Sequence, residues 1–252
     1  MRIDGMPTEE VLRGLLDEAR ASGAEQVVVE TDHESGDAWI RAGFTERARV
    51  LEAPLETVER LLTGAKEPSF GAVHVQTDDV EAVARAVRQF VPRLPGGSKG
   101  SVVAPPRNGW TAVYDELCDR EPEMLRRLAR ELSDRMGAIV LHLGVEEGAV
   151  VRFAFLERGR VMDEYLSLPE YHGPLPPGDI IGLGANPTVV ARLTGADPSQ
   201  VRAVARTAAG PQELPPAAEL VVQIAAVLGV EGAEHGYAEA RTIPGALDLP
   251  RA

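Results

Sequence analysis

The chain has a single cysteine, few aromatic residues and no long hydrophobic run. Because Cys118 is alone, an internal disulfide bond is excluded, which fits a reducing compartment. The longest apolar run, near Val221 to Val230, is far too short to span a bilayer. The chain also does not open on the charged and then apolar segment of a signal peptide. We therefore expect a cytoplasmic protein.

Basic residues are scarce as well. Lys and Arg number 26 against 39 Asp and Glu, a net charge of −13, and Lys66 and Lys99 are the only lysines. The electrostatic field of this negative net charge repels phosphate backbones and anionic lipid. We therefore expect neither nucleic acid nor a membrane as partner. The hydrophobic fraction of 44% suits a globular core built mostly of Val, Leu and Ala. A protein or small-molecule partner stays open, as does a homodimer.

The first segment, residues 1–64, is predicted to be a small domain of alternating helices and strands. Thr8 caps a helix that ends at Gly23, and a strand follows at Val27 to Val29. A short helix through Trp39 precedes one strand-like run from Phe44 to Leu51, and a further helix follows Pro54. We expect the Val27 strand to pair with the His74 or the Trp110 strand in one shared sheet, because an apolar edge must be covered.

The remaining chain is predicted to hold an α+β domain at 69–168 and a helical region at 179–241. Alternation and turn residues indicate the order βαβ and then αβββ, hence an α+β sandwich with a mostly antiparallel sheet and helices on one sheet face. Glu147-Gly148 and Arg158-Gly159 supply the turns between the last three strands. Residues 168–178 read as a proline-rich connector, and residues 242–252 as a loosely held tail.

Part of the first segment resembles the GNAT acetyltransferase family. The runs Leu12 to Ala24, Val27 to Asp32 and Ala42 to Phe44 are similar to its third helix, fifth strand, fourth helix and sixth strand. The resemblance covers residues of about 8–52, the C-terminal half of that fold. It implies a GNAT-like αβαβ half domain and an ancestral site for acetyl-CoA; an αβα unit without shared ancestry is the alternative.

This chain departs from the family where the cofactor should bind. The vestigial CoA loop would comprise Arg2, Gly5 and Pro7, and proline has no N–H to offer a diphosphate. Asp4 adds a negative charge there. Trp39 occupies the position at which many family members carry the tyrosine that protonates the thiolate, and an indole N–H is no useful acid. The half domain is therefore predicted to be degenerate, with no catalytic or cofactor-binding residue.

Few other residues suggest chemistry. Asp163 to His172 is the densest polar and aromatic cluster, and Tyr165, Glu170, Tyr171 and His172 are the candidate ligand-binding residues. The alternative is that the tyrosines seal the connector against the sheet. The five histidines lack metal-site spacing, so no metal is expected. His74 and His142 read as half-buried strand residues, Cys118 as structural, and Gly182 to Pro187 as a flexible entry to a helix rather than a phosphate loop.

Two hypotheses of function follow. The first is a non-catalytic protein that binds a partner or ligand and needs no cofactor. The alternative is a GNAT-type N-acetyltransferase that uses acetyl-CoA and is completed in trans, or an enzyme whose chemistry lies in the middle segment.

Acetyl-CoA separates these hypotheses. We predict no binding at micromolar acetyl-CoA, because Pro7 and Asp4 stand where the cofactor's diphosphate needs N–H donors. Isothermal titration calorimetry measures this directly. A saturable heat signal in that range would contradict the prediction and revive the acetyltransferase.

Overall fold

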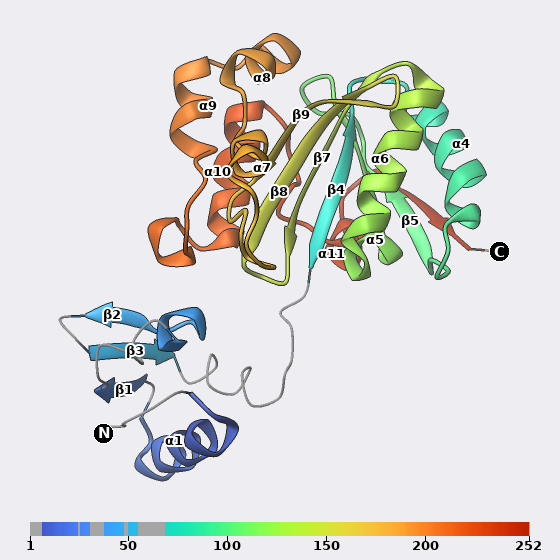
Figure 1. Cartoon of the computed structure of the whole chain (residues 1–252). Helices are drawn as coiled ribbons and strands as arrows, with labels where there is room; N and C mark the ends of the chain where they lie inside the picture. The colour runs from blue at the N-terminus through green and yellow to red at the C-terminus, as the bar shows by residue number, and fades with distance from the viewer. Residues whose placement is uncertain (1–6, 25, 31–37, 48–49, 55–68, 252) are drawn as a thin grey trace. The chain divides into compact units, whose positions relative to one another are not determined.

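The computed structural model describes residues 7–24, 26–30, 38–47, 50–54 and 69–251. It divides into two compact units, Met1–Glu67 with Gly210–Gln212 and Pro68–Ala209 with Glu213–Ala252. The fold is α+β, with an antiparallel seven-stranded sheet and a helical C-terminal region (Figure 1).

The first unit combines helix α1 (Glu9–Ser22) with a three-stranded antiparallel sheet. Thr8 caps α1, and Gly23 ends it in the left-handed conformation, as the sequence predicted. The strands β1 (Gln26–Glu30), β2 (Thr45–Arg47) and β3 (Val50–Pro54) lie in the order β1-β3-β2. Buried side chains of α1 and β1 pack with Trp39 and Phe44, whose rings meet edge to face.

Two predictions for this unit were wrong. The Val27 to Val29 strand pairs with β3, not with the His74 or Trp110 strand, since the run from Phe44 onward turns back on itself and covers its edge. That run is two strands rather than one. The helix predicted after Pro54 lies outside the described residues.

The second unit is built on a sheet of order β10-β5-β6-β4-β7-β8-β9, in which every neighbouring pair is antiparallel. Its strands are β4 (Phe70–Val75), β5 (Gly100–Val103), β6 (Thr111–Asp115), β7 (Ile139–Glu146), β8 (Val150–Glu157), β9 (Arg160–Leu166) and β10 (Leu247–Pro250). The predicted turns Glu147-Gly148 and Arg158-Gly159 connect β7, β8 and β9. All four residues have positive φ, as the two central residues of a type I′ turn require.

Helices cover both faces of this sheet. Those of residues 69–168 lie on one face, as the sequence predicted, and helices of the C-terminal region cover the other. The helices are α4 (Val80–Phe90), α5 (Glu116–Arg120), α6 (Pro122–Met136), α7 (Pro177–Gly182), α8 (Pro187–Thr194), α9 (Pro198–Val204), α10 (Ala217–Leu228) and α11 (Tyr237–Ala240), with 3₁₀ turns at Val91–Arg93 and Pro211–Glu213. Figure 1 shows α4 and α6 on one side of the sheet and α8 to α10 on the other.

Two apolar cores result, one on each face. Val83 and Val87 of α4 and Leu128 of α6 pack with Val73 and Val140 of the sheet. On the opposite face, α8, α9 and α10 pack against large side chains of β7 and β8. The helical region that the sequence set apart as residues 179–241 therefore shares its core with the sheet.

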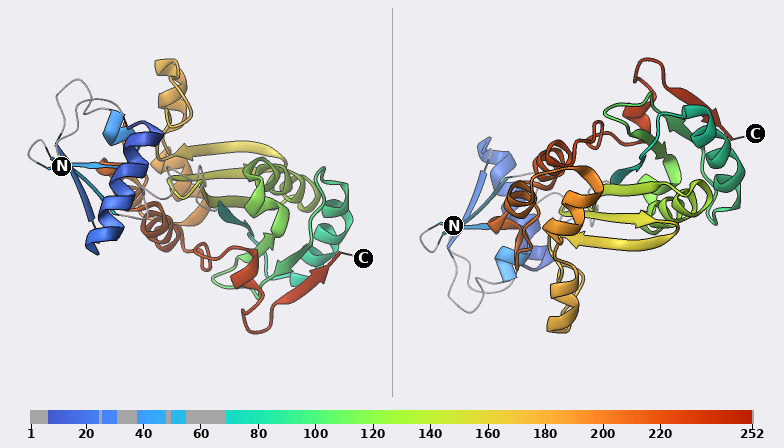
Figure 2. Two further views of the ribbon diagram at one scale, coloured as in Figure 1. Left: turned by 90° about the horizontal axis from the view of Figure 1, so that it is seen from below. Right: turned by 90° about the horizontal axis from the view of Figure 1, so that it is seen from above.

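The C-terminal residues are not the loose tail that the sequence indicated. Leu247–Pro250 forms β10, which pairs with β5 at the edge of the sheet beside α4 (Figure 2). Leu249 is buried in the α4 core. A strand of four residues is too short to show a clear periodicity, and prolines lie at its end and shortly before it. The sequence therefore gave no signal for β10. No helix in the described part of the chain is long and apolar enough to cross a membrane.

Candidate functional site

Side-chain size falls across one row of the seven-stranded sheet. Residues that pair directly on neighbouring strands place their side chains on the same face. Phe155 pairs with Leu141, Leu141 with His74, and His74 with Ala112. The amide of Ala104, one strand further, bonds to the carbonyl of Ala112. The row thus runs from large side chains at β8 to small ones at β5.

A cleft of about 480 Å³ lies where the row becomes small. The large side chains of β7 and β8 fill the space beneath α10, whereas alanines leave it open. We call this space the alanine cleft. Its lining comprises His74, Ala104, Pro105, Arg107, Trp110, Ala112, Tyr114, Val222, Ala225, Ala226, Val230, Glu231, Gly232, Glu234, His235, Ile243 and Pro244. Its size and mostly apolar lining with a few polar groups are typical of small-molecule sites.

His74 is the polar residue on the cleft floor. Its side chain is 1% exposed, and its Nε2 atom is buried without a hydrogen-bond partner in the described part of the protein. Burial lowers the pKa of His74 to about 4, so the imidazole is neutral at pH 7. Buried polar atoms are nearly always paired, and those left unpaired often mark a functional site.

The loop after α10, which forms one wall of the cleft, is held in place by two partly buried hydrogen bonds. The Tyr114 hydroxyl donates to the Gly232 carbonyl at 2.9 Å. Gly232 has φ +80° and a Cβ there would overlap that hydroxyl, so only glycine fits. The Tyr237 amide donates to Asp119 Oδ2 at 2.6 Å, and burial raises the pKa of Asp119 to about 6. The loop that carries Glu231 to His235 is therefore anchored at both ends.

The rim of the cleft carries charge of mixed sign. Glu231 accepts a hydrogen bond from the Asn108 side chain at 3.2 Å. Glu234 lies 3.6 Å from His235 Nε2 and, after burial, is the second cause of the raised pKa of Tyr114. Arg107 is exposed and is the arginine of the lining. Two carboxylates therefore face one guanidinium around an apolar interior.

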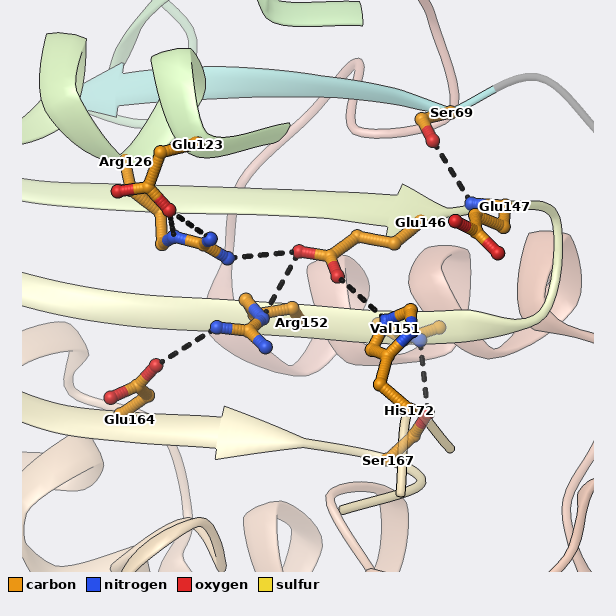
Figure 3. A network of polar contacts seen from close by, with 10 residues as sticks. All are labelled: Ser69, Glu123, Arg126, Glu146, Glu147, Val151, Arg152, Glu164, Ser167 and His172. Atoms are coloured by element: carbon orange, nitrogen blue, oxygen red, sulfur yellow. Dashed lines mark hydrogen bonds and ion pairs between the residues drawn. The ribbon is translucent and has the colours of Figure 1, made fainter. Parts of the chain in front are cut away.

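A second polar feature is an ion-pair network on the opposite sheet face, centred on Glu146 of β7 (Figure 3). Arg126 of α6 donates to Glu146 Oε1 at 3.1 Å, and Arg152 Nε lies 3.1 Å from the same oxygen. The Arg152 N–H is not aligned with that oxygen and makes no hydrogen bond. Arg152 also donates to Glu164 at 3.3 Å, and Arg126 to Glu123. The two arginines are thus neutralised by carboxylates, as in a structural network.

The candidate ligand residues from the sequence do not gather in one place. His172 joins the network, with Nε2 3.9 Å from Glu146, and the Tyr171 ring packs edge-on against it. Glu170 accepts a hydrogen bond from the Leu175 amide within the connector. Tyr165 lies on the other sheet face, where it stacks on Phe153 and donates to the Arg206 carbonyl at 2.8 Å.

The side chain of Tyr165 is fully buried with its hydroxyl bonded to the Arg206 carbonyl, outside the connector. That the tyrosines seal the connector stays a prediction. Of the vestigial CoA loop, Arg2 and Gly5 lie outside the described residues, and Pro7 directly precedes the cap of α1.

His142 and Cys118 both border a cavity of about 10 Å³ beside the network, too small for more than one water molecule. Burial, and then Arg126 and Arg152, lower the pKa of His142 to about 3. Burial and two aspartates raise the pKa of Cys118, which opposes nucleophilic use. No group of three metal-ligating side chains occurs among the described residues.

One further hollow, of about 580 Å³, runs along α4 and the end of α6. Its lining is chiefly exposed and polar, with Asp79, Arg85, Gln89 and Arg135 all exposed. The alanine cleft differs from it in having a buried, unpaired polar atom on its floor. Sequence reasoning missed this site, although the run Ala72-Val73-His74-Val75 held a signal: the only polar residue of the strand shares a face with a small one.

Replacing His74 with Leu is expected to stabilise the protein. The change removes a buried polar atom that has no partner in the described structure. Because such an atom costs about 1–3 kcal/mol, the free energy of unfolding at pH 7 should rise by about 1 kcal/mol or more. Urea unfolding of both proteins measures the difference, and a loss of stability would contradict this account of His74.

The free energies of unfolding of wild type and His74→Leu should also respond differently to acid. The unfolded chain takes up a proton on His74 below its ordinary pKa of 6.5, whereas the folded protein does so only near pH 4. His74 therefore removes stability from wild type as pH falls through this window, by up to about 1.4 kcal/mol per pH unit, and the variant lacks this contribution. His142 and Asp119 are common to both proteins and cancel. A difference that stays constant from pH 6.5 to 4 would contradict the prediction.

The alanine cleft is thus the candidate site: a mostly apolar hollow with an anchored wall, a charged rim and the buried His74 among its lining residues. The Glu146 network, by contrast, has its charges satisfied. In comparisons with models of known protein families, with curated proteins and with solved structures, no match to this chain is found.

Proposed function

We propose that this protein is a non-catalytic binding protein that takes a small molecule into the alanine cleft. The observation that carries the proposal is a mostly apolar cleft of about 480 Å³ with an anchored wall and a few charged groups at its rim. A ligand with an apolar surface would cover this lining, and the removal of that surface from water favours binding.

The titratable groups of the cleft support binding rather than acid–base catalysis. An efficient general base has a pKa near the working pH, whereas burial lowers that of His74 to about 4. Burial raises the pKa of Tyr114, whose hydroxyl proton is already donated to Gly232. Neither group is tuned for proton transfer at neutral pH.

We further propose that the first unit is a degenerate GNAT-like half domain with a structural or partner-binding role. The protein as a whole is proposed to be cytoplasmic. Its described elements run in the order helix, strand, helical turn at 38–41 and two strands. The acetyltransferase completed in trans is the other candidate from the sequence, and acetyl-CoA titration decides between the two.

Blocking the cleft tests the proposal. Ala226 is exposed on α10 and lines the cleft, so a Trp at this position would occupy the hollow without entering a packed core. We expect Nile red, a neutral dye that fluoresces in apolar sites, to bind wild type saturably. Ala226→Trp should weaken that binding at least about tenfold, because the apolar contact area is lost.

Ala218 supplies the matched control. It is exposed on the same helix but does not line the cleft. Ala218→Trp should bind the dye as wild type does. If both variants or neither lose binding, the dye site is elsewhere and the proposed function fails.

A further inference from the structure

We propose that Asp119 is a proton-sensitive clasp that holds the C-terminal segment, residues 231–250, to the sheet more firmly in mild acid than at neutral pH. We call this segment the strap. The clasp is a property of the fold and does not depend on the proposed binding function.

The strap crosses the sheet face on which the alanine cleft lies. Ile243 and Ala246 pack with Ala112 and its neighbours, and the end of the strap forms β10 beside β5. Strap residues that line the cleft occur before α11, within 231–235, and after it, at 243–244. The attachment of α11 therefore holds both of these parts in place.

Asp119 makes that attachment. Its Oδ1 accepts a hydrogen bond from the Gly71 amide of β4 at 3.3 Å, and its Oδ2 accepts one from the Tyr237 amide at 2.6 Å. One carboxylate thus joins the sheet to the first residue of α11, which lies 118 residues further along the chain. In the described part of the protein, no Lys or Arg side chain forms an ion pair with Asp119.

The charged groups that face Asp119 are carboxylates as well. Asp119 Oδ2 and Glu239 Oε2 lie 2.8 and 3.1 Å from the point that a Cβ on Gly236 would occupy, so the two carboxylates approach one another. Asp115, at the end of β6, adds a further negative charge, whereas β4 and α6 present no charged side chain to Asp119 among the described residues. Burial is the main cause, and Glu239 and Asp115 lesser ones, that raise the pKa of Asp119 to about 6.

The raised pKa makes the docking of the strap depend on protons. When the strap is released, water reaches the carboxylate, Glu239 moves away, and the pKa of Asp119 falls towards its ordinary value of 3.8. Between these two values the docked form binds more protons than the released form. Docking therefore strengthens as pH falls through 6 and weakens as pH rises. A protonated Asp119 keeps a carbonyl oxygen that accepts the hydrogen bond from Tyr237.

Native-state hydrogen exchange, followed by nuclear magnetic resonance without ligand, tests the clasp. The Tyr237 amide reports release of the strap, and the amide of the buried Leu128 in α6 reports global unfolding. With rates corrected for the intrinsic effect of pH, Tyr237 should be less protected than Leu128. Its protection should rise from pH 7 to pH 5 by up to about tenfold. Equal protection of the two amides, or no rise at Tyr237, would overturn the clasp.

Three variants assign the response. In Asp119→Asn the side-chain oxygen still accepts from Tyr237 but the group stays neutral, so the protection of Tyr237 should not change between pH 7 and pH 5. Asp248→Asn is the matched control, since Asp248 is an exposed carboxylate of the same strap, 3.2 Å from Arg241. His235→Gln removes the histidine of the strap.

Both controls should keep the wild-type response. A response that persists in Asp119→Asn, or that is lost in either control, would overturn the assignment to Asp119. If Asp119→Asn does not fold, the comparison of Tyr237 with Leu128 in wild type decides alone. Because no ligand is present, the clasp and the proposed binding function can fail independently of one another.

Discussion

The spacing between α10 and the seven-stranded sheet is the constraint on which the candidate site depends. Large side chains such as Leu141 and Phe155 set that spacing where α10 packs on β7 and β8. Protein interiors are close-packed, so a fixed gap must be filled by side chains of matching size. Beyond His74 the row continues with alanines, which cannot fill it. A rigid hollow follows from side-chain size alone.

His74 conflicts with its surroundings in a way that packing does not explain. An apolar residue of similar volume would satisfy the row between Leu141 and Ala112 without leaving a polar atom unpaired. Natural sequences are locally consistent, and violations concentrate at functional sites. By contrast, the buried Asp115 accepts hydrogen bonds from Ser98, Ser101 and the Leu117 amide. This carboxylate is paired at a similar depth, whereas Nε2 of His74 has no partner in the described part of the protein.

Local signals in the sequence predicted local structure well. Thr8 and Gly23 bound α1, and the turns of positive φ at Glu147 and Arg158 separate β7, β8 and β9. The packing of these elements against one another left weaker signals in the sequence. The period of α10 indicates an inward face but not which surface receives it, so the sequence set apart as a separate region a helix that covers the second face of the sheet. The cleft joins β4 and β6 with the loop after α10, which lies more than a hundred residues further along the chain. No local pattern encodes that meeting.

The candidate ligand residues from the sequence illustrate the same limit. Tyr165 and His172 are close in sequence, yet strand alternation and the following connector send them to opposite faces of the sheet. Density of polar and aromatic residues along the chain is therefore a poor guide to a site. Pairing across strands, which brings His74 beside Ala112, is what builds one.

The most direct test is nuclear magnetic resonance of the five imidazoles in ¹⁵N-labelled protein at pH 7, with and without Nile red. His74→Leu assigns the His74 signals by their disappearance. The account predicts that the His74 signals move with the fraction of protein bound, since the dye occupies the cleft that His74 lines. The signals of His142 and His172, on the other sheet face, should stay in place. His74 signals that do not move while Nile red binds would contradict the account.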